Sequence, residues 1–180
     1  ATPGILHVRG YVAPPGNEKG PAVCHLSIAF DQPDVSSIAG LTVYVPAIYA
    51  QATARLHVQH VRIVRAWDGI DIRGNTGGTV IQNVEMSAFN KGIDIDGALD
   101  SIYIDTFHAW PFGCTFNQQT ALLASTTTYP IHCARVDDLK IANSLFLTGY
   151  KVRFYTSGNG PCWVTMSHCT LHTGCGYSQE

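Results

Sequence analysis

The chain has 180 residues, enough for one domain with a sizeable buried core. Only 13% of the residues are charged and the formal net charge is −2, so neither nucleic acid nor an anionic membrane surface is an expected partner. No apolar run reaches the roughly 18 residues of a membrane-inserting helix. Abundant Gly, Val and Ile with only two Met favour a β-rich chain over a helical bundle.

The first periodic segment lies at residues 25–30, where HLSIAF alternates apolar and polar side chains. It matches HVRIVR at residues 60–65. A stretch that contains QPDVSSIAGLTVYVPAIYA separates the two, and we predict an inserted loop region over residues 31–55. Loops that project from a rigid scaffold often carry binding residues, although the Pro and Asp near its start also suit an ordinary turn.

A repeat of about 23 residues occupies the middle of the chain. Residues 58–72 (VQHVRIVRAWDGIDI) align without a gap over residues 81–95 (IQNVEMSAFNKGIDI). The same offset continues into residues 104–116 (IDTFHAWPFGCTF), and an offset of about 25 relates residues 141–149 to residues 166–174. Each unit holds short alternating segments separated by Asn, Gly or Asp, and none holds an amphipathic segment long enough for a helix.

Repeats of this length without a helix predict an all-β fold, a right-handed parallel β-helix (solenoid) with coils of about 23–25 residues stacked about 4.8 Å apart. We expect residues 1–180 to form a single such domain. Two ladders of inward side chains should share one core: Val61, Val84 and Phe107, and Ile70, Ile93 and Phe116. Another register should mark a turn where a left-handed backbone is tolerated, and its members are His60, Asn83, Thr106, Asn143 and His168.

One outward column of the stacked repeat contains Arg62, Glu85 and His108. Glu85 is a candidate general base or nucleophile beside Arg62, His108 is a second candidate catalytic group, and Trp110 is a nearby platform for a sugar ring. Arg62 and His108 would equally suit a lyase, in which a cation neutralises the carboxylate of a uronate. The same column is also what a simple ladder of surface ion pairs would look like.

A second column contains Asp71 and Asp94, and Asn117 should continue it. Vertical neighbours would place two carboxyl groups about 5 Å apart, the separation found in retaining glycosidases. Two like charges that close would raise the pKa of one carboxyl and give a proton donor at neutral pH. In the alternative, both acids point into water and have no catalytic role.

The remaining candidates are less specific. Trp67, near a strand end, is a candidate substrate-binding residue, and capping or packing between subunits would explain it equally well. Cys and His three positions apart in residues 162–175 have a spacing that zinc ligands use. His168 and Cys169 already fall in the repeat register, however, so we expect neither a metal site nor a cofactor, and we expect reduced cysteines.

Five stretches carry a family resemblance: IAFDQPDV, YVPAIYA, VRIVRAWDGIDIRGNTGG, IDIDGALDSIYI and FHAWPFG. Over roughly residues 20–150 they resemble the central β-helix of bacteriophage tailspike proteins of the pectate-lyase-like superfamily, most closely those with polysaccharide depolymerase activity. The resemblance implies a homotrimeric virion spike, acting outside the host cell, that binds and degrades a bacterial surface polysaccharide (capsule, O-antigen or exopolysaccharide) during host attachment. The enzyme would be a glycoside hydrolase or a polysaccharide lyase.

Tailspikes are normally several times longer than this chain and carry a particle-binding head and a C-terminal trimerisation region. We therefore expect the chain to be a fragment of a longer tailspike. Two other functions stay open, because one β-helix can serve all three. The first is a non-catalytic glycan receptor-binding spike. The second is a secreted pectate-lyase-like polysaccharide lyase, which the lack of a signal sequence and of a clear calcium-binding Asp cluster disfavours.

Overall fold

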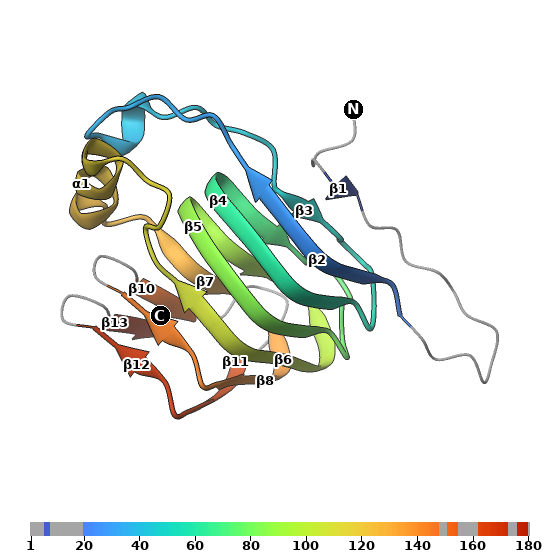
Figure 1. Ribbon diagram of the computed structural model, residues 1–180. Helices are drawn as coiled ribbons and strands as arrows, with labels where there is room; N and C mark the ends of the chain where they lie inside the picture. Colours follow the sequence, from blue (N-terminus) through green and yellow to red (C-terminus); the bar gives the residue numbers. More distant parts are fainter. Residues whose placement is uncertain (1–5, 8–19, 148–150, 155–161, 173–175, 180) are drawn as a thin grey trace.

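The computed structural model describes residues 6–7, 20–147, 151–154, 162–172 and 176–179. In these residues every strand pair is parallel, and the strands belong to one sheet (Figure 1). The expectation of an all-β chain is thus confirmed. The elements are β1 (Leu6–His7), β2 (Ala22–Ala29), η1 (Ile38–Gly40), β3 (Ile48–Tyr49), β4 (His57–Asp71), β5 (Val80–Ile95), β6 (Ala98–Ala109), α1 (Phe116–Ala124), β7 (Tyr129–Cys133), β8 (Val136–Ala142), β9 (Leu145–Phe146), β10 (Lys151–Phe154), β11 (Cys162–Ser167), β12 (Thr170–Leu171) and β13 (Gly176–Gln179).

Strands β4 and β5 form the centre of the sheet and run side by side along their whole lengths (Figure 1). Their first halves lie between β2 on one side and β6 on the other, and the pairing continues through β8 to β11. Their second halves lie between β3 and β7, and the pairing continues to β10 and β13. Val58 pairs with Ile81 and Ile70 with Ile93, so the repeat offset of 23 residues is confirmed as the register between β4 and β5, except at an irregularity where Ala66 pairs with Ala88.

The predicted turn register is confirmed at all of its positions. The backbone is left-handed, with φ between 50° and 53°, at His60, Asn83, Thr106, Asn143 and His168. His25 joins the series with φ 55°, and its ring stacks on that of His60 at 4.8 Å. Asn tolerates this conformation better than other residues with a side chain, which explains the Asn at two of the positions.

The core confirms one predicted ladder and corrects the other. Val61, Val84 and Phe107 are stacked and buried. Ile70 and Ile93 are buried as well, but Phe116 does not continue them, because its side chain is 83% exposed at the start of α1. Ile131 of β7 pairs with Ile93 instead.

Helix α1 is the reason for this correction, and the repeat pattern did not predict it. Thr115 caps the helix by accepting a hydrogen bond from the backbone N–H of Gln118, and the Gln118 side chain accepts one from the backbone N–H of Thr115. This T-x-x-Q pattern is a capping box, a signal that was readable in the sequence. The chain therefore leaves the 23-residue repeat after β6 and rejoins the sheet only at β7. Asn117 lies on the helix, so it does not continue the Asp71/Asp94 column, and His132 occupies that place.

The segment inserted between β2 and β4 is fastened at both ends. Gln32 closes its outer part, with its amide nitrogen donating to the Thr42 carbonyl and its amide oxygen accepting from the Thr42 N–H, both at 2.8 Å. Gln118 of α1 donates to the carbonyls of Gln32 and Pro33, which docks the helix on this segment. The inner end returns to the sheet as β3, where Ile48 pairs with Ile70. Residues just after β3 are thereby held beside the second half of β4.

Candidate functional site

The best-formed candidate site is a cavity of about 470 Å³ between β3 and the second halves of β4 and β5, which we call the acid pocket. Five charged side chains line it, and they are Asp68, Asp71, Arg73, Lys91 and Asp94. The sequence repeat puts them there, since Asp68 pairs with Lys91 and Asp71 with Asp94 on the neighbouring strand.

Glycine shapes the strands of the acid pocket. Gly69 lies directly over Gly92, and a Cβ on Gly69 would come within 2.4 Å of the Gly92 carbonyl oxygen. A side chain does not fit at that position. Both copies of the repeat therefore have glycine at this place: Gly69 follows Asp68, and Gly92 follows Lys91.

Asp71 and Asp94 are vertical neighbours, as predicted, but neither points into water. Asp71 is 4% exposed and Asp94 7% exposed. The guanidinium of Arg73 lies between the two carboxylates, with Nη2 2.7 Å from Asp71 Oδ2 and Nε 3.5 Å from Asp94 Oδ2. Gln51 donates to both oxygens of Asp71, and Tyr49 donates to Gln51.

Asp94 has two further neighbours that meet its carboxylate oxygens through nitrogen atoms. Lys91 Nζ and His132 Nδ1 each lie 2.8 Å from one of its carboxylate oxygens. Burial raises the pKa of Asp94, but the hydrogen bonds and charges of His132 and Lys91 outweigh that effect and leave the pKa below its ordinary value. Asp94 is therefore the ionised member of the pocket and does not serve as its proton donor.

Asp68 is the acid that sequence reasoning missed as a functional residue. Burial raises its pKa above the ordinary value, and the charge of Asp94 raises it further, against hydrogen bonds from the Asn90 amide and the Lys91 backbone N–H. The sequence did show that Asp68 aligns with Lys91 in the repeat and lies three residues before Asp71. It did not show that Asp68 would be buried.

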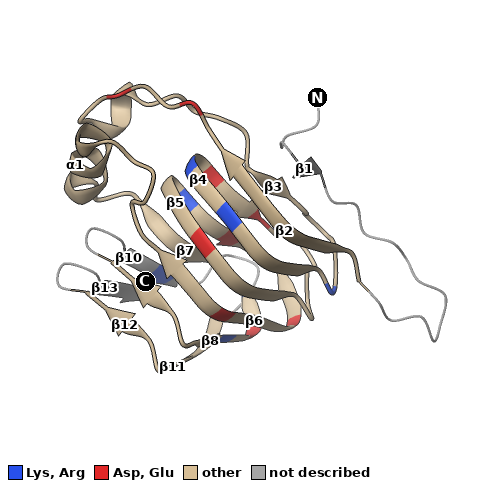
Figure 2. Ribbon diagram, in the orientation of Figure 1, with Lys and Arg blue, Asp and Glu red and all other residues tan. Residues whose placement is uncertain are grey.

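The Arg62 column is confirmed as a stack but lies in a different pocket. Glu85 pairs with Arg62 below and with His108 above, and Arg62 Nη2 is 2.6 Å from Glu85 Oε2. Figure 2 shows this basic position and this acidic position next to each other on β4 and β5. Phe112 lies 5.4 Å from the Arg62 guanidinium, and Trp110 meets the His108 ring edge-on at 5.5 Å.

These five side chains line an open cavity of about 310 Å³, which we call the aromatic groove. The Arg62 and Glu85 side chains are 57% and 40% exposed, so their ion pair is solvated and contributes little stability. The aromatic groove and the acid pocket share no lining residue. The structure thus does not bring Glu85 together with Asp71 or Asp94.

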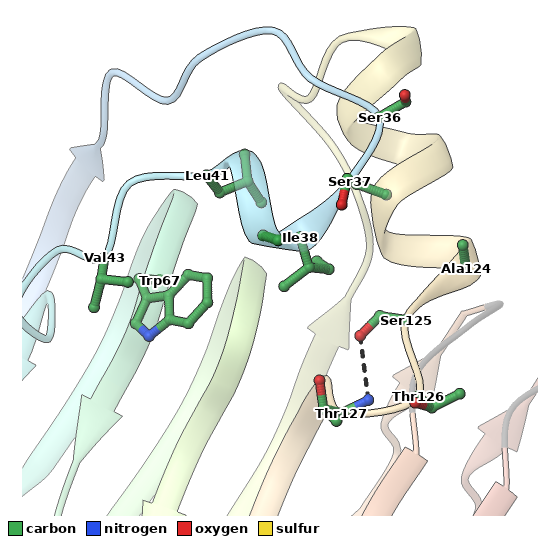
Figure 3. Close-up of a pocket in the computed structure, with 12 residues that line it drawn as sticks. Ser36, Ser37, Ile38, Leu41, Val43, Trp67, Ala124, Ser125, Thr126 and Thr127 are labelled. Carbon is green, nitrogen blue, oxygen red and sulfur yellow. Dashed lines mark hydrogen bonds between the residues drawn. The ribbon is translucent and has the colours of Figure 1, made fainter.

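A third cavity, of about 520 Å³, lies where β4, the inserted segment and the end of α1 meet, and we call it the Trp67 pocket. Figure 3 shows Trp67 next to Val43, with Ile38, Ser125 and Thr127 on the side towards the end of α1. Hydroxyl groups, small apolar side chains and one indole line it, and no charged residue is among the described residues that do so. Trp67 directly precedes Asp68, so this pocket adjoins the acid pocket along the chain.

No protein-family profile, curated protein or solved structure matches the chain. Within the described ranges, no three His, Cys, Asp or Glu side chains are grouped so that they could hold a metal ion. The same part of the chain contains no helix long and apolar enough to cross a membrane. The acid pocket, the aromatic groove and the Trp67 pocket are therefore the features from which a function has to be argued.

Proposed function

We propose that this chain is the glycan-binding and glycan-cleaving part of a tailspike-type polysaccharide depolymerase, with the acid pocket as its active site. The observation that carries the proposal is the pair Asp68 and Asp94. Both line one cavity, and their surroundings move their pKa values in opposite directions. Two carboxyl groups whose surroundings move their pKa values apart are what a glycoside hydrolase uses as its acid and base.

The proposal includes the finer architecture, a right-handed parallel β-helix. Three features support it: the register of 23 residues between β4 and β5, the left-handed turn residues aligned from strand to strand, and the buried ladder of Val61, Val84 and Phe107. In a β-helix the neighbouring coils present their outward side chains as continuous columns, which suits an extended polymer as substrate.

In the proposed mechanism Asp68 is the general acid. It donates its proton to the glycosidic oxygen, while ionised Asp94 accepts a proton from the attacking water. Asp68 and Asp94 come from the neighbouring strands β4 and β5 and line the same cavity. Because Asp94 activates water and forms no bond to the sugar in this mechanism, inversion at the anomeric carbon is expected.

The other charged groups position this pair. Arg73 holds Asp71 and faces Asp94, so it fixes both carboxylates relative to each other. Lys91 and His132 keep Asp94 ionised. The Trp67 pocket, with one indole and several hydroxyls but no charge, suits a neutral sugar residue next to the cleaved bond.

The test is a screen of the protein against capsular, O-antigen and exopolysaccharide preparations, with release of new reducing ends as the readout. Asp68→Asn and Asp94→Asn should each lower the cleavage rate at least about a hundredfold. NMR of the first products should show the inverted anomer. Cleavage that persists in both variants, or a product with unsaturated uronate, would contradict the assignment.

A non-catalytic receptor-binding spike is the second candidate, and the aromatic groove favours it. Trp110 is 43% exposed and lines the same groove as Arg62, so the groove offers both an aromatic platform and a cation. If this function is correct, Trp110→Ala weakens glycan binding by at least about tenfold while neither the variant nor the wild type releases reducing ends.

We further propose that the intact protein is a homotrimer on the virion. Helix α1 supports association, because Phe116 is 83% and Leu123 52% exposed on it. Light scattering of the full-length parent should give three times the mass of one chain. A stable monomer would contradict this part of the proposal.

A further inference from the structure

Two cysteines from strands far apart in the sequence meet at the edge of the core. Cys133 is the last residue of β7 and Cys162 the first of β11, and their Sγ atoms are 3.2 Å apart. Cys133 is fully buried, whereas Cys162 is half-buried and packs against the core. Cys162 pairs with Val136 of the neighbouring strand β8, three residues after Cys133.

We infer that Cys133 and Cys162 are a cross-linking site, in which a small-molecule disulfide such as oxidised glutathione converts the two thiols into an intramolecular disulfide. The sulfur atoms need to approach by only about 1 Å to reach bonding distance. Among the described residues no second pair of cysteines is in contact. The inference does not depend on the proposed function.

The order of the reaction follows from the environment of each thiol. The hydrogen bond with Cys162 and then burial raise the pKa of Cys133, while the hydrogen bond from Cys133 lowers the pKa of Cys162. Cys162 is thus the thiolate that attacks first, and it is also the more exposed of the two.

In the first step Cys162 forms a mixed disulfide with the oxidant and releases one thiolate. The Cys133 sulfur, on giving up its proton, then attacks the Cys162 sulfur and displaces the second thiolate. The two protons from the cysteines end on the two released thiols, so the oxidant is reduced by two electrons and the protein loses two hydrogens.

The cross-link closes a loop whose ends are 29 residues apart, and it ties β7 to β11. In the chain-entropy account a loop of this length raises the melting temperature of a domain of this size by about 10 °C. The effect should be seen on the 180-residue chain itself, without any glycan.

The experiment oxidises the folded protein with oxidised glutathione, blocks the remaining thiols with N-ethylmaleimide, and maps the digest by mass spectrometry without reductant. We expect a linked fragment that joins Cys133 to Cys162 and a melting temperature that falls by about 10 °C after reduction. Cys162→Ala should abolish both results. Cys24→Ala, at an exposed position on β2, is the matched control and should preserve both.

Two outcomes would overturn the inference. One is recovery of Cys133 and Cys162 as separate maleimide adducts after oxidation. The other is a linked fragment in which Cys162 is joined to a different cysteine. Because both are read on the wild-type chain, the result stands even if the Cys162→Ala variant folds poorly.

Discussion

The acid pocket and the aromatic groove are built from the same two strands and the same 23-residue offset, yet their electrostatics differ. In the groove, Arg62 and Glu85 form an ion pair that is about half exposed. In the acid pocket, Asp71 and Asp94 are less than a tenth exposed. What differs is the surroundings: Tyr49 of the neighbouring strand β3 and Gln51 after it line the acid pocket beside Asp71, while the groove is more open to water. In the acid pocket, burial and hydrogen bonds together move the pKa values of Asp68 and Asp94 in opposite directions.

We expect the largest effect from a substitution in the buried core that both sites share. Ile93 is fully buried next to Asp94, and Ile93→Asp would place an unpaired charge in the core. We expect loss of cooperative folding, measured by circular dichroism and thermal melting. Tyr103→Asp, at an exposed position on β6, should fold normally. A soluble Ile93→Asp protein that melts cooperatively would contradict the register of the sheet.

The next comparison removes one carboxylate from each site. Asp94→Asn leaves the charge of Lys91 without its buried partner, although Arg73 keeps Asp71, and should lower the free energy of unfolding by about 3 kcal/mol. Glu85→Gln removes a solvated ion pair and should cost less than about 1 kcal/mol. Urea unfolding measures both values. Equal losses in the free energy of unfolding would show that the surroundings of the acid pocket do not isolate Asp94 from water.

The pH dependence of stability should separate Asp94 from Asp68. The folded pKa of Asp94 is lowered, so its contribution is present above its unfolded value of about 3.9 and is lost as the pH falls through the folded value. Burial raises the pKa of Asp68, so its contribution is present below the unfolded value and is lost as the pH rises through the folded value.

Urea unfolding across the pH range checks both signs. The stability advantage of the wild type over Asp94→Asn should shrink below about pH 4. Asp68→Asn should gain stability relative to the wild type as the pH rises above about 4, because the variant does not ionise. Parallel curves for the wild type and both variants would mean that neither acid is perturbed.

The sequence predicted those parts of the fold that repeat without a gap. Counting 23 residues was enough to align Arg62, Glu85 and His108 and to place Asp71 next to Asp94, because each step along the sheet used one complete repeat. The left-handed turns followed for the same reason, since a shared register implies a shared backbone conformation.

The same counting failed where the chain changed its path. Phe116 and Asn117 were placed one repeat above Ile93 and Asp94, but α1 intervenes and β7 supplies Ile131 and His132 instead. A constant repeat length cannot reveal a helix that is inserted between two strands. The capping box at Thr115 carried that information locally, and it identifies the start of a helix without any repeat.

The chemistry of the candidate site was the hardest part to predict. Asp68, Asp71 and Asp94 are ordinary aspartates in an alternating strand, and the groups that distinguish them come from far away. Gln51 lies 20 residues before Asp71, and His132 lies 38 residues after Asp94. Burial by such distant segments is a property of the assembled fold, so only the structure separates Asp68 from its neighbours.

The most direct test of the acid pocket is the rate of polysaccharide cleavage by Asp68→Asn and Glu85→Gln, measured side by side with wild type on the polysaccharide that the wild type degrades. If the acid pocket is the active site, Asp68→Asn lowers the rate at least about a hundredfold without loss of thermal stability, and Glu85→Gln stays within about twofold of the wild type. The reverse result, with Asp68→Asn fully active and Glu85→Gln inactive, would contradict the account and place catalysis in the aromatic groove.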